Sequence, residues 1–271
     1  MTRPGAETYP HGHHASVVAA HGARTAATSC GYLLEHLSPG TSLLDVGFGP
    51  GSITADLAAI VAPAPVVGLE SASGAVDLAR ALMAERGVDN ITLREGSVYE
   101  LPFEDGSFDV VHCHQVLQYL SDPPAALREM ARVARRVVAA REVDYATMHW
   151  APLNPGMEDW LESYRSAARE SGGEPDAARH LRAWANAASY DLLGEVRLEA
   201  STWTYATAES TRWWGDVQAA RVLESEQNAS LRAIGVDDDR LARMAADWKA
   251  WGEHPDAWFS MVHGELLLLK W

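Results

Sequence analysis

The chain has 271 residues, of which 47% are hydrophobic and 22% are charged, proportions typical of a folded globular protein. It contains 22 lysines and arginines against 37 aspartates and glutamates, which gives a formal net charge of −15. Because phosphate backbones and anionic lipids repel a chain with this charge, we expect neither a nucleic-acid partner nor a role at a membrane surface.

Apolar strands and amphipathic helices alternate along the first half of the chain. We predict strands over 42–46, 66–69, 91–95, 108–113 and 137–142, and helices over 28–37, 52–60, 74–86 and 123–133. Such alternation implies parallel strands joined by right-handed crossovers, and therefore a doubly wound α/β sheet. Ligands of these sheets bind beyond the carboxyl ends of the strands.

The alternation ends after residue 144. We predict helices over 156–171, 175–190 and most of 208–251, and two late strands over 196–205 and 261–270. The late strands are expected to form a hairpin at the sheet edge, with a large helical insertion between them. We therefore divide the chain into an N-terminal cap segment (1–27), a ligand-binding core (28–147) and a region that completes the same domain and adds helical insertions (148–271).

The number of cysteines and the length of the apolar runs indicate the cellular compartment. Cys30 and Cys113 are too few for a disulfide framework and lack the spacing of a zinc or redox site, so we expect two buried, reduced thiols. No apolar run reaches the length of a signal-peptide core or a membrane-spanning helix. These features predict a cytoplasmic protein.

The strongest chemical signal is the segment 42–51, with the sequence SLLDVGFGPG. An apolar strand ends at Asp45 and enters a G-x-G-x-G loop, whose glycines let a ligand touch the backbone ahead of a helix N-terminus. A nicotinamide dinucleotide fingerprint would have its third glycine at position 52, where the chain has Ser52. Asp45 would also oppose a pyrophosphate, whereas it suits a ligand with a cationic amine.

Glu70 follows the second predicted strand, 19 residues beyond Gly51. A carboxylate at this strand tip can accept hydrogen bonds from both hydroxyls of an adenosine ribose. An acidic residue after a strand is by itself more often a solvated loop residue. The glycine loop at this spacing favours the functional interpretation.

Three further blocks complete a family pattern: GSVYELPF at 96–103, GSFDVV at 106–111 and LQYLSD at 117–122. With the glycine loop and Glu70, they resemble the class I S-adenosylmethionine-dependent methyltransferases. The resemblance covers about residues 28–144. It is strongest to the branch of the ubiquinone and menaquinone C-methyltransferases, the methyltransferase type 11 domain, and their small-molecule relatives. It implies a Rossmann-like seven-stranded sheet with an antiparallel last strand and helices on both faces. The cofactor would be S-adenosylmethionine, released as S-adenosylhomocysteine.

The resemblance also assigns cofactor residues, and Ser97 is one position at which this chain departs from the family pattern. It assigns Asp45, Gly47 and Gly49 to the methionine portion of the cofactor and Glu70 to the ribose. The adenine would be bordered by Ser71 or Ala72, by the backbone of Val98, and by Ser97. Ser97 stands where the family commonly has an aspartate, so its hydrogen bond to the adenine amine would be a weaker, neutral one.

The N-terminal segment around Tyr9 resembles the cap with which a subset of these enzymes closes over the cofactor. Its histidines, at 11, 13, 14 and 21, could also suggest a metal site. Adjacent histidines cannot both face one point on a regular element, and no carboxylate lies at a ligand spacing. We therefore expect no metal, and either a cap containing Tyr9 or a disordered terminus.

The candidates for catalysis and for contact with the methyl acceptor lie in the segments that follow the fourth and fifth predicted strands. His114 and Gln115 follow the fourth strand, where the family brings the chain past the transferable methyl group, so His114 is assigned to both cofactor and catalysis. His149 is the second candidate base, with Glu142 and Asp144 behind it, although a surface histidine is an equally good interpretation.

All ten tryptophans lie after residue 149, which suggests that the second half lines or covers a cavity. Trp150, Trp213 and Trp214 are the candidates, with Gln115, for contacting the acceptor. The alternative is that the rings simply pack large helices. If they line a pocket, the acceptor is a small, partly apolar or aromatic metabolite of specialised metabolism, methylated at O, C or N. A homodimer is possible.

Two other functions compete. A nicotinamide-dependent oxidoreductase could use the same topology, but Ser52 and Asp45 argue against it and cofactor titration would discriminate. A non-catalytic binding protein could retain the fold. However, Asp45, Gly47, Gly49 and Glu70 all keep the residue types that binding of the cofactor requires.

Overall fold

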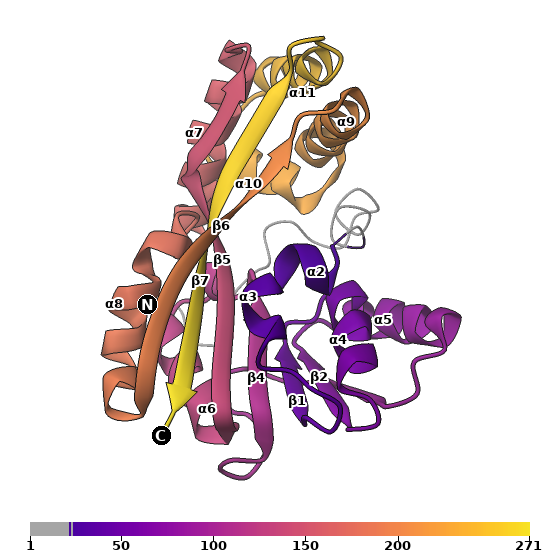
Figure 1. Ribbon diagram of the computed structural model, residues 1–271. Coiled ribbons are helices and arrows are strands. Elements are labelled where there is room, and N and C mark those ends of the chain that lie inside the picture. Colours follow the sequence, from indigo (N-terminus) through magenta and orange to yellow (C-terminus); the bar gives the residue numbers. More distant parts are fainter. Residues whose placement is uncertain (1–21, 23) are drawn as a thin grey trace.

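Seven strands form one sheet in the computed structural model, which describes residue 22 and residues 24–271 (Figure 1). The strand order is β3-β2-β1-β4-β5-β7-β6. The first five strands are parallel, and β7 runs antiparallel to both β5 and β6. This topology confirms the predicted sheet and its antiparallel last strand. The strands are β1 (Leu43–Val46), β2 (Val66–Glu70), β3 (Ile91–Glu95), β4 (Phe108–His114), β5 (Ala134–Ala151), β6 (Gly194–Tyr205) and β7 (Trp258–Lys270).

Helices cover both faces of this sheet. Buried side chains of α6 and α8 pack on one face, and those of α2, α3 and α4 pack on the other, with α5 beside α4 (Figure 1). Their bounds are α2 (Ala26–Ser29), α3 (Gly31–Leu34), α4 (Ser52–Val61), α5 (Ser73–Arg86), α6 (Pro123–Val133) and α8 (Leu181–Ala187). Three short 3-10 helices, η1 (Leu117–Tyr119), η2 (Ala177–His180) and η3 (Tyr190–Leu192), complete the described helices of this part.

The helix ends follow local sequence signals. The Asp122 side chain accepts a hydrogen bond from the Ala125 amide, and Pro123 occupies the first turn, so α6 begins where the sequence predicts. Gly87 ends α5 in the left-handed conformation, with φ +64°, where a side chain would be strained. These caps fix the lengths of the helices that flank the ligand-binding edge.

A second helical layer surrounds the C-terminal ends of β5 and β6 and the N-terminal end of β7 (Figure 1). We call it the helical cap; it consists of α7 (Pro155–Glu170), α9 (Ala208–Glu224), α10 (Glu226–Ala233) and α11 (Asp238–Gly252). The cap has its own core, in which Trp160, Trp214, Trp248 and Trp251 pack with Phe259. Most of the apolar surface of the late helices is therefore used to hold the cap together.

Several element bounds differ from the prediction. β5 spans 18 residues, because β7 supplies antiparallel partners as far as Ala151, opposite Trp258. The predicted domain boundary at 147 thus falls inside a strand. The predicted helix over 28–37 divides into α2 and α3 at Cys30, and that over 175–190 is the series η2, α8 and η3. No helix in the described ranges is both long and apolar enough to span a bilayer.

Candidate active site

A cavity of about 390 Å³ lies at the carboxyl ends of the parallel strands. Its walls come from the glycine loop after β1, the end of β2, residues 95–99 after β3, and residues 112–120 around the end of β4. Arg24 adds a side chain from the N-terminal side. This is the edge at which the order of parallel strands predicts a ligand.

The glycine loop forms one wall. Gly47 has φ +69°, and a Cβ atom there would clash with the side chain of Val116. Its amide donates to the Leu69 carbonyl at 2.7 Å, which ties the loop to the end of β2. Only glycine meets both the conformation and the close approach, so the exposed backbone of the loop can face a ligand.

Glu70 joins the glycine loop to the turn after β2. One carboxylate oxygen accepts from the Gly49 amide at 3.1 Å, and the other accepts from the amides of Ser71 at 2.8 Å and Ala72 at 3.2 Å. The carboxylate is therefore held in place while it lines the cavity. An ionised carboxylate in this position suits a ligand with two adjacent hydroxyls.

Asp45 is buried in a polar cluster that the sequence analysis did not predict. Its two oxygens bind His112 Nδ1 at 2.7 Å and the Thr54 hydroxyl at 2.7 Å, and Cys30 Sγ lies 3.3 Å from His112 Nε2. Burial alone would lower the pKa of His112, but its interactions and hydrogen bonds with Cys30 and Asp45 raise it to about 10. His112 is therefore a cation that holds Asp45 in position.

This assignment predicts how stability depends on pH. Because the pKa of His112 is higher in the folded chain than its ordinary value, its stabilising effect is complete below about pH 6.5 and is lost as pH rises towards 10. We expect the melting temperature of the wild type to fall over this interval. His112→Gln should flatten that decline, and the exposed His149→Gln should keep the wild-type slope. Parallel slopes for all three proteins would contradict the assignment.

His114 ends β4 and enters the cavity. It is 8% exposed, and neither ring nitrogen has a hydrogen-bond partner among the described residues. Burial, together with the positive charges of Arg24 and Arg141, holds its pKa well below the ordinary value. Its ring lies 5.9 Å from that of Trp203 on β6. The cavity therefore contains a neutral imidazole with free ring nitrogens.

The residue after His114 connects the cavity to the edge strands. Gln115 has φ +54°, and its side chain accepts from Arg24 Nη2 at 3.0 Å and lies 3.0 Å from His263 Nε2. Arg24 is the only lysine or arginine among the described residues that line the cavity. Its charge suits a ligand carboxylate. Nothing in its sequence surroundings singles it out, since the resemblance begins four residues later.

Glu142 positions the segment after β4. Its carboxylate accepts from the amides of Val116 at 2.9 Å, Leu117 at 2.8 Å and Gln118 at 3.3 Å. Burial raises its pKa to about 7, although these three donors act in the opposite direction. Glu142 therefore supports the cavity wall and does not itself line the cavity.

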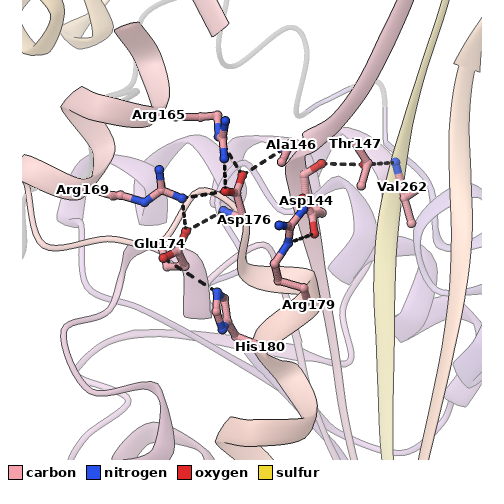
Figure 2. A network of polar contacts seen from close by, with 10 residues as sticks. All are labelled: Asp144, Ala146, Thr147, Arg165, Arg169, Glu174, Asp176, Arg179, His180 and Val262. Carbon is pink, nitrogen blue, oxygen red and sulfur yellow. Dashed lines mark hydrogen bonds and ion pairs between the residues drawn. The ribbon is translucent and has the colours of Figure 1, made fainter. Parts of the chain in front are cut away.

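Asp144 belongs to a network that joins β5 to α7 and η2 (Figure 2). Both of its oxygens accept from Arg179, at 2.7 and 2.8 Å. Nearby, Asp176 pairs with Arg165 and Arg169, and it accepts from the Ala146 amide at 2.9 Å. The carboxylate considered as a candidate base is thus occupied by an ion pair that joins β5 to η2.

The structure brings most of the predicted site residues together. The cavity is lined by Asp45, Gly47, Gly49, Glu70, Ser71, Ser97, Val98, His114 and Gln115. Tyr9 and the N-terminal histidines lie outside the described residues. Among the residues that are described, no group of three or more histidine, cysteine or acidic side chains could hold a metal.

Four predicted residues do not line this cavity. His149 is exposed and pairs with Ser260, because β5 continues past the sheet and carries position 149 away from the strand tips. Trp150 stacks on Phe259, with 6.4 Å between ring centroids. Trp214 is 4% exposed in the core of the cap, and the half-buried Trp213 packs against that core. These positions agree with the alternative interpretation, in which the rings pack the helices.

Known proteins share both the sequence pattern and the fold. Residues 44–137 match the family model described as a methyltransferase domain. The chain is 33% identical to an uncharacterised methyltransferase of Schizosaccharomyces pombe, over 97% of this chain and 96% of that protein. It is 37% identical to a demethylmenaquinone methyltransferase of Lactococcus lactis, over 46% of this chain and 48% of that protein. The crystal structure of YcgJ from Bacillus subtilis has the same fold, with a TM-score of 0.54 at 18% identity, covering 87% of this chain and 96% of that one.

The cavity also fits the methyl donor of such enzymes. S-adenosylmethionine has a ribose diol and a carboxylate, and the cavity offers the carboxylate of Glu70 and the guanidinium of Arg24. Because Gly47 and Gly49 have no side chains, a ligand can approach their backbone closely. The family match, the full-length relative and this set of donors and acceptors agree. The chain therefore belongs to the class I S-adenosylmethionine-dependent methyltransferases.

Proposed function

We propose that the chain methylates an O, C or N atom of a small, partly apolar or aromatic metabolite in specialised metabolism, and that His114 accepts the proton released by an O–H or N–H acceptor. The observation that supports this most is the buried imidazole in the cavity, whose ring nitrogens have no partner among the described residues. Its lowered pKa keeps the ring neutral near pH 7, as a base requires.

The cofactor supplies a methyl group that its sulfonium already activates, so the protein mainly has to align the acceptor and exclude water. Gln115 is held by Arg24 and His263, which fixes its backbone and side chain beside His114. Trp203 lies against both His114 and His263. We therefore assign the acceptor contact to Gln115, which lines the cavity, in place of Trp150, Trp213 and Trp214, which do not.

The proposed reaction is tested by incubating the protein with S-adenosylmethionine and small phenols, aromatic amines and enolisable ketones. We expect S-adenosylhomocysteine and a product heavier by one methylene unit to form together, both measured by mass spectrometry. Tight binding of NADP without binding of S-adenosylhomocysteine would contradict the proposal. It would favour the oxidoreductase alternative.

Cofactor affinity should depend strongly on Glu70. Hydrogen bonds to a charged group contribute about 1.5–3 kcal/mol and neutral ones about 1 kcal/mol, so Glu70→Ala should weaken S-adenosylhomocysteine binding tens-fold or more and Ser97→Ala only several-fold. Glu95 pairs with Glu70 in the register of β2 and β3 and also lines the cavity, which makes Glu95→Ala the matched control. Calorimetry showing equal losses for Glu70→Ala and Glu95→Ala would mean that the ribose lies elsewhere.

Assembly and partners remain predictions. The net charge of −15 supports a small-molecule acceptor over a nucleic acid. A homodimer is tested by size-exclusion chromatography with light scattering, where a mass near 29.4 kDa would exclude it.

A further inference from the structure

Arg221 is a buried cation in the helical cap, outside the cavity described above. It lies on α9, and its side chain leaves the residue only 5% exposed. Its guanidinium carbon lies 5.8 Å from the centroid of the Trp214 ring. Among the described residues, neither Nε nor Nη2 has a hydrogen-bond partner.

A second buried arginine shows what a structural role requires. Arg141 is fully buried, and its Nε donates to Glu265 Oε1 at 3.1 Å, while its Nη2 donates to the Ser201 hydroxyl at 3.0 Å. In Arg141 only Nη1 lacks a described partner, whereas in Arg221 both Nε and Nη2 lack one. Because a buried charge without a partner is strongly unfavourable, Arg221 is suited to an anion that comes from outside the chain.

Other unpaired polar groups accompany Arg221. Gln218 lies three residues earlier on α9 and is 2% exposed, and its Oε1 has no partner within the described ranges. Gln227 is fully buried, and both atoms of its side-chain amide lack a described partner. The Ser225 hydroxyl donates to the backbone carbonyl of Arg221 at 2.7 Å and accepts from the backbone N–H of Gln227 at 3.1 Å, so it joins the main chain at these two residues.

Aromatic rings on β6 lead from this region towards the active site. Burial raises the pKa of Tyr145, and it raises that of Tyr205 to about 12, while the positive charges of Arg24 and Arg221 oppose the rise at both. Tyr205 stacks on Trp214 at 4.6 Å. Arg221 lies over the same Trp214 ring, and Trp203, two residues before Tyr205 on β6, has its ring 5.9 Å from that of His114 in the cavity, so ring contacts connect Arg221 with the active site.

We propose that Arg221, assisted by Gln218 and Gln227, binds a carboxylate of the methyl acceptor, which is therefore a small organic acid. The guanidinium can bind a carboxylate through two parallel hydrogen bonds, and an amide N–H can donate to the same oxygens. The proposal rests on the proposed methyl transfer to a small molecule. It adds the chemical class of the acceptor.

The first test needs no acceptor. Replacing a buried, unpaired cation by an apolar side chain of similar length leaves the stability of the folded protein unchanged or raises it. Removing one partner of a buried ion pair lowers that stability, because the other charge stays buried without a partner. Without ligands, Arg221→Met should leave the melting temperature unchanged or raise it by about 2 °C. Arg141→Met should lower it, because Glu265 loses its cation. A fall with Arg221→Met as large as that with Arg141→Met would overturn the proposal.

The second test measures binding to protein saturated with S-adenosylhomocysteine. The probes are 4-hydroxybenzoate, 4-hydroxyphenylacetate and caffeate, each compared with its neutral methyl ester by calorimetry. In the wild type at least one acid should bind about 10-fold or more tightly than its ester. Arg221→Met should remove this preference. Equal binding of acid and ester in every pair, or an unchanged preference in Arg221→Met, would overturn the proposal.

The two proposals fail in different ways. If S-adenosylhomocysteine itself does not bind to the wild type, the methyl-transfer function fails before any acid is tested. If the acids bind through Arg221 and no methylated product forms from them, the anion site is supported and their role as acceptors is contradicted.

Discussion

Replacement of His114 by asparagine is expected to lower kcat about 100-fold for an O–H or N–H acceptor, the lower range of what a positioned general base contributes. The side chain keeps its approximate size and polarity, but it cannot accept the proton. S-adenosylhomocysteine binding, measured by calorimetry, should change much less than kcat. His149→Asn is the matched control, because His149 is exposed at the far end of β5. An equal loss in both variants, or none in His114→Asn, would contradict the role of His114.

The pH profile gives an independent measurement of the same group. The pKa of His114 lies well below its ordinary value, mainly because the ring is buried, so the neutral base persists into mildly acidic solution. The acid limb of kcat/KM should therefore lie well below pH 6.5 in the wild type. A limb at or above pH 6.5 would show that a different, more solvated group controls the reaction.

The cavity residues that follow β1 and β2 were predictable because they lie at the ends of parallel strands. Asp45 lies one residue before the end of β1 and Glu70 ends β2, and neighbouring parallel strands place their carboxyl ends at one edge. The conformation of the glycine loop depends on the backbone freedom of its own glycines, which can be read from the sequence. Sequence spacing therefore translates directly into position for this part of the site.

The supporting residues could not be placed in the same way. His112 alternates with apolar residues in β4, a sign of a buried polar group, but the sequence does not show that Asp45 and Cys30 meet it. These contacts join positions 67 and 82 residues apart. They depend on strand register and helix packing, which single-sequence patterns leave open.

The second half was hardest to predict because its aromatic residues permit two arrangements. A tryptophan on an amphipathic helix has the same spacing whether it lines a pocket or fills a core. The length of β5 decided the outcome, since pairing with β7 carries Trp150 and His149 beyond the strand tips. Trp203, on β6, does not line the cavity, but its ring lies 5.9 Å from that of His114, which does.

The position of Trp214 leads to the prediction with the largest effect on stability. The ring is 4% exposed and lies 4.6 Å from Tyr205 and 5.8 Å from Phe259, between ring centroids. Trp214→Ala removes a large apolar side chain from the core of the cap. We expect the free energy of unfolding, from urea titration, to fall by about 3–5 kcal/mol.

Trp213 is the matched control, since it is the preceding residue on the same helix and is only half-buried. Trp213→Ala should lower the free energy of unfolding by roughly 1 kcal/mol, which is within the range of ordinary substitutions. A core role for Trp214 requires a large difference between the two variants. The contrary result would be that Trp214→Ala leaves stability unchanged and raises the Michaelis constant of the acceptor. The ring would then contact the acceptor directly, in a pocket within the cap.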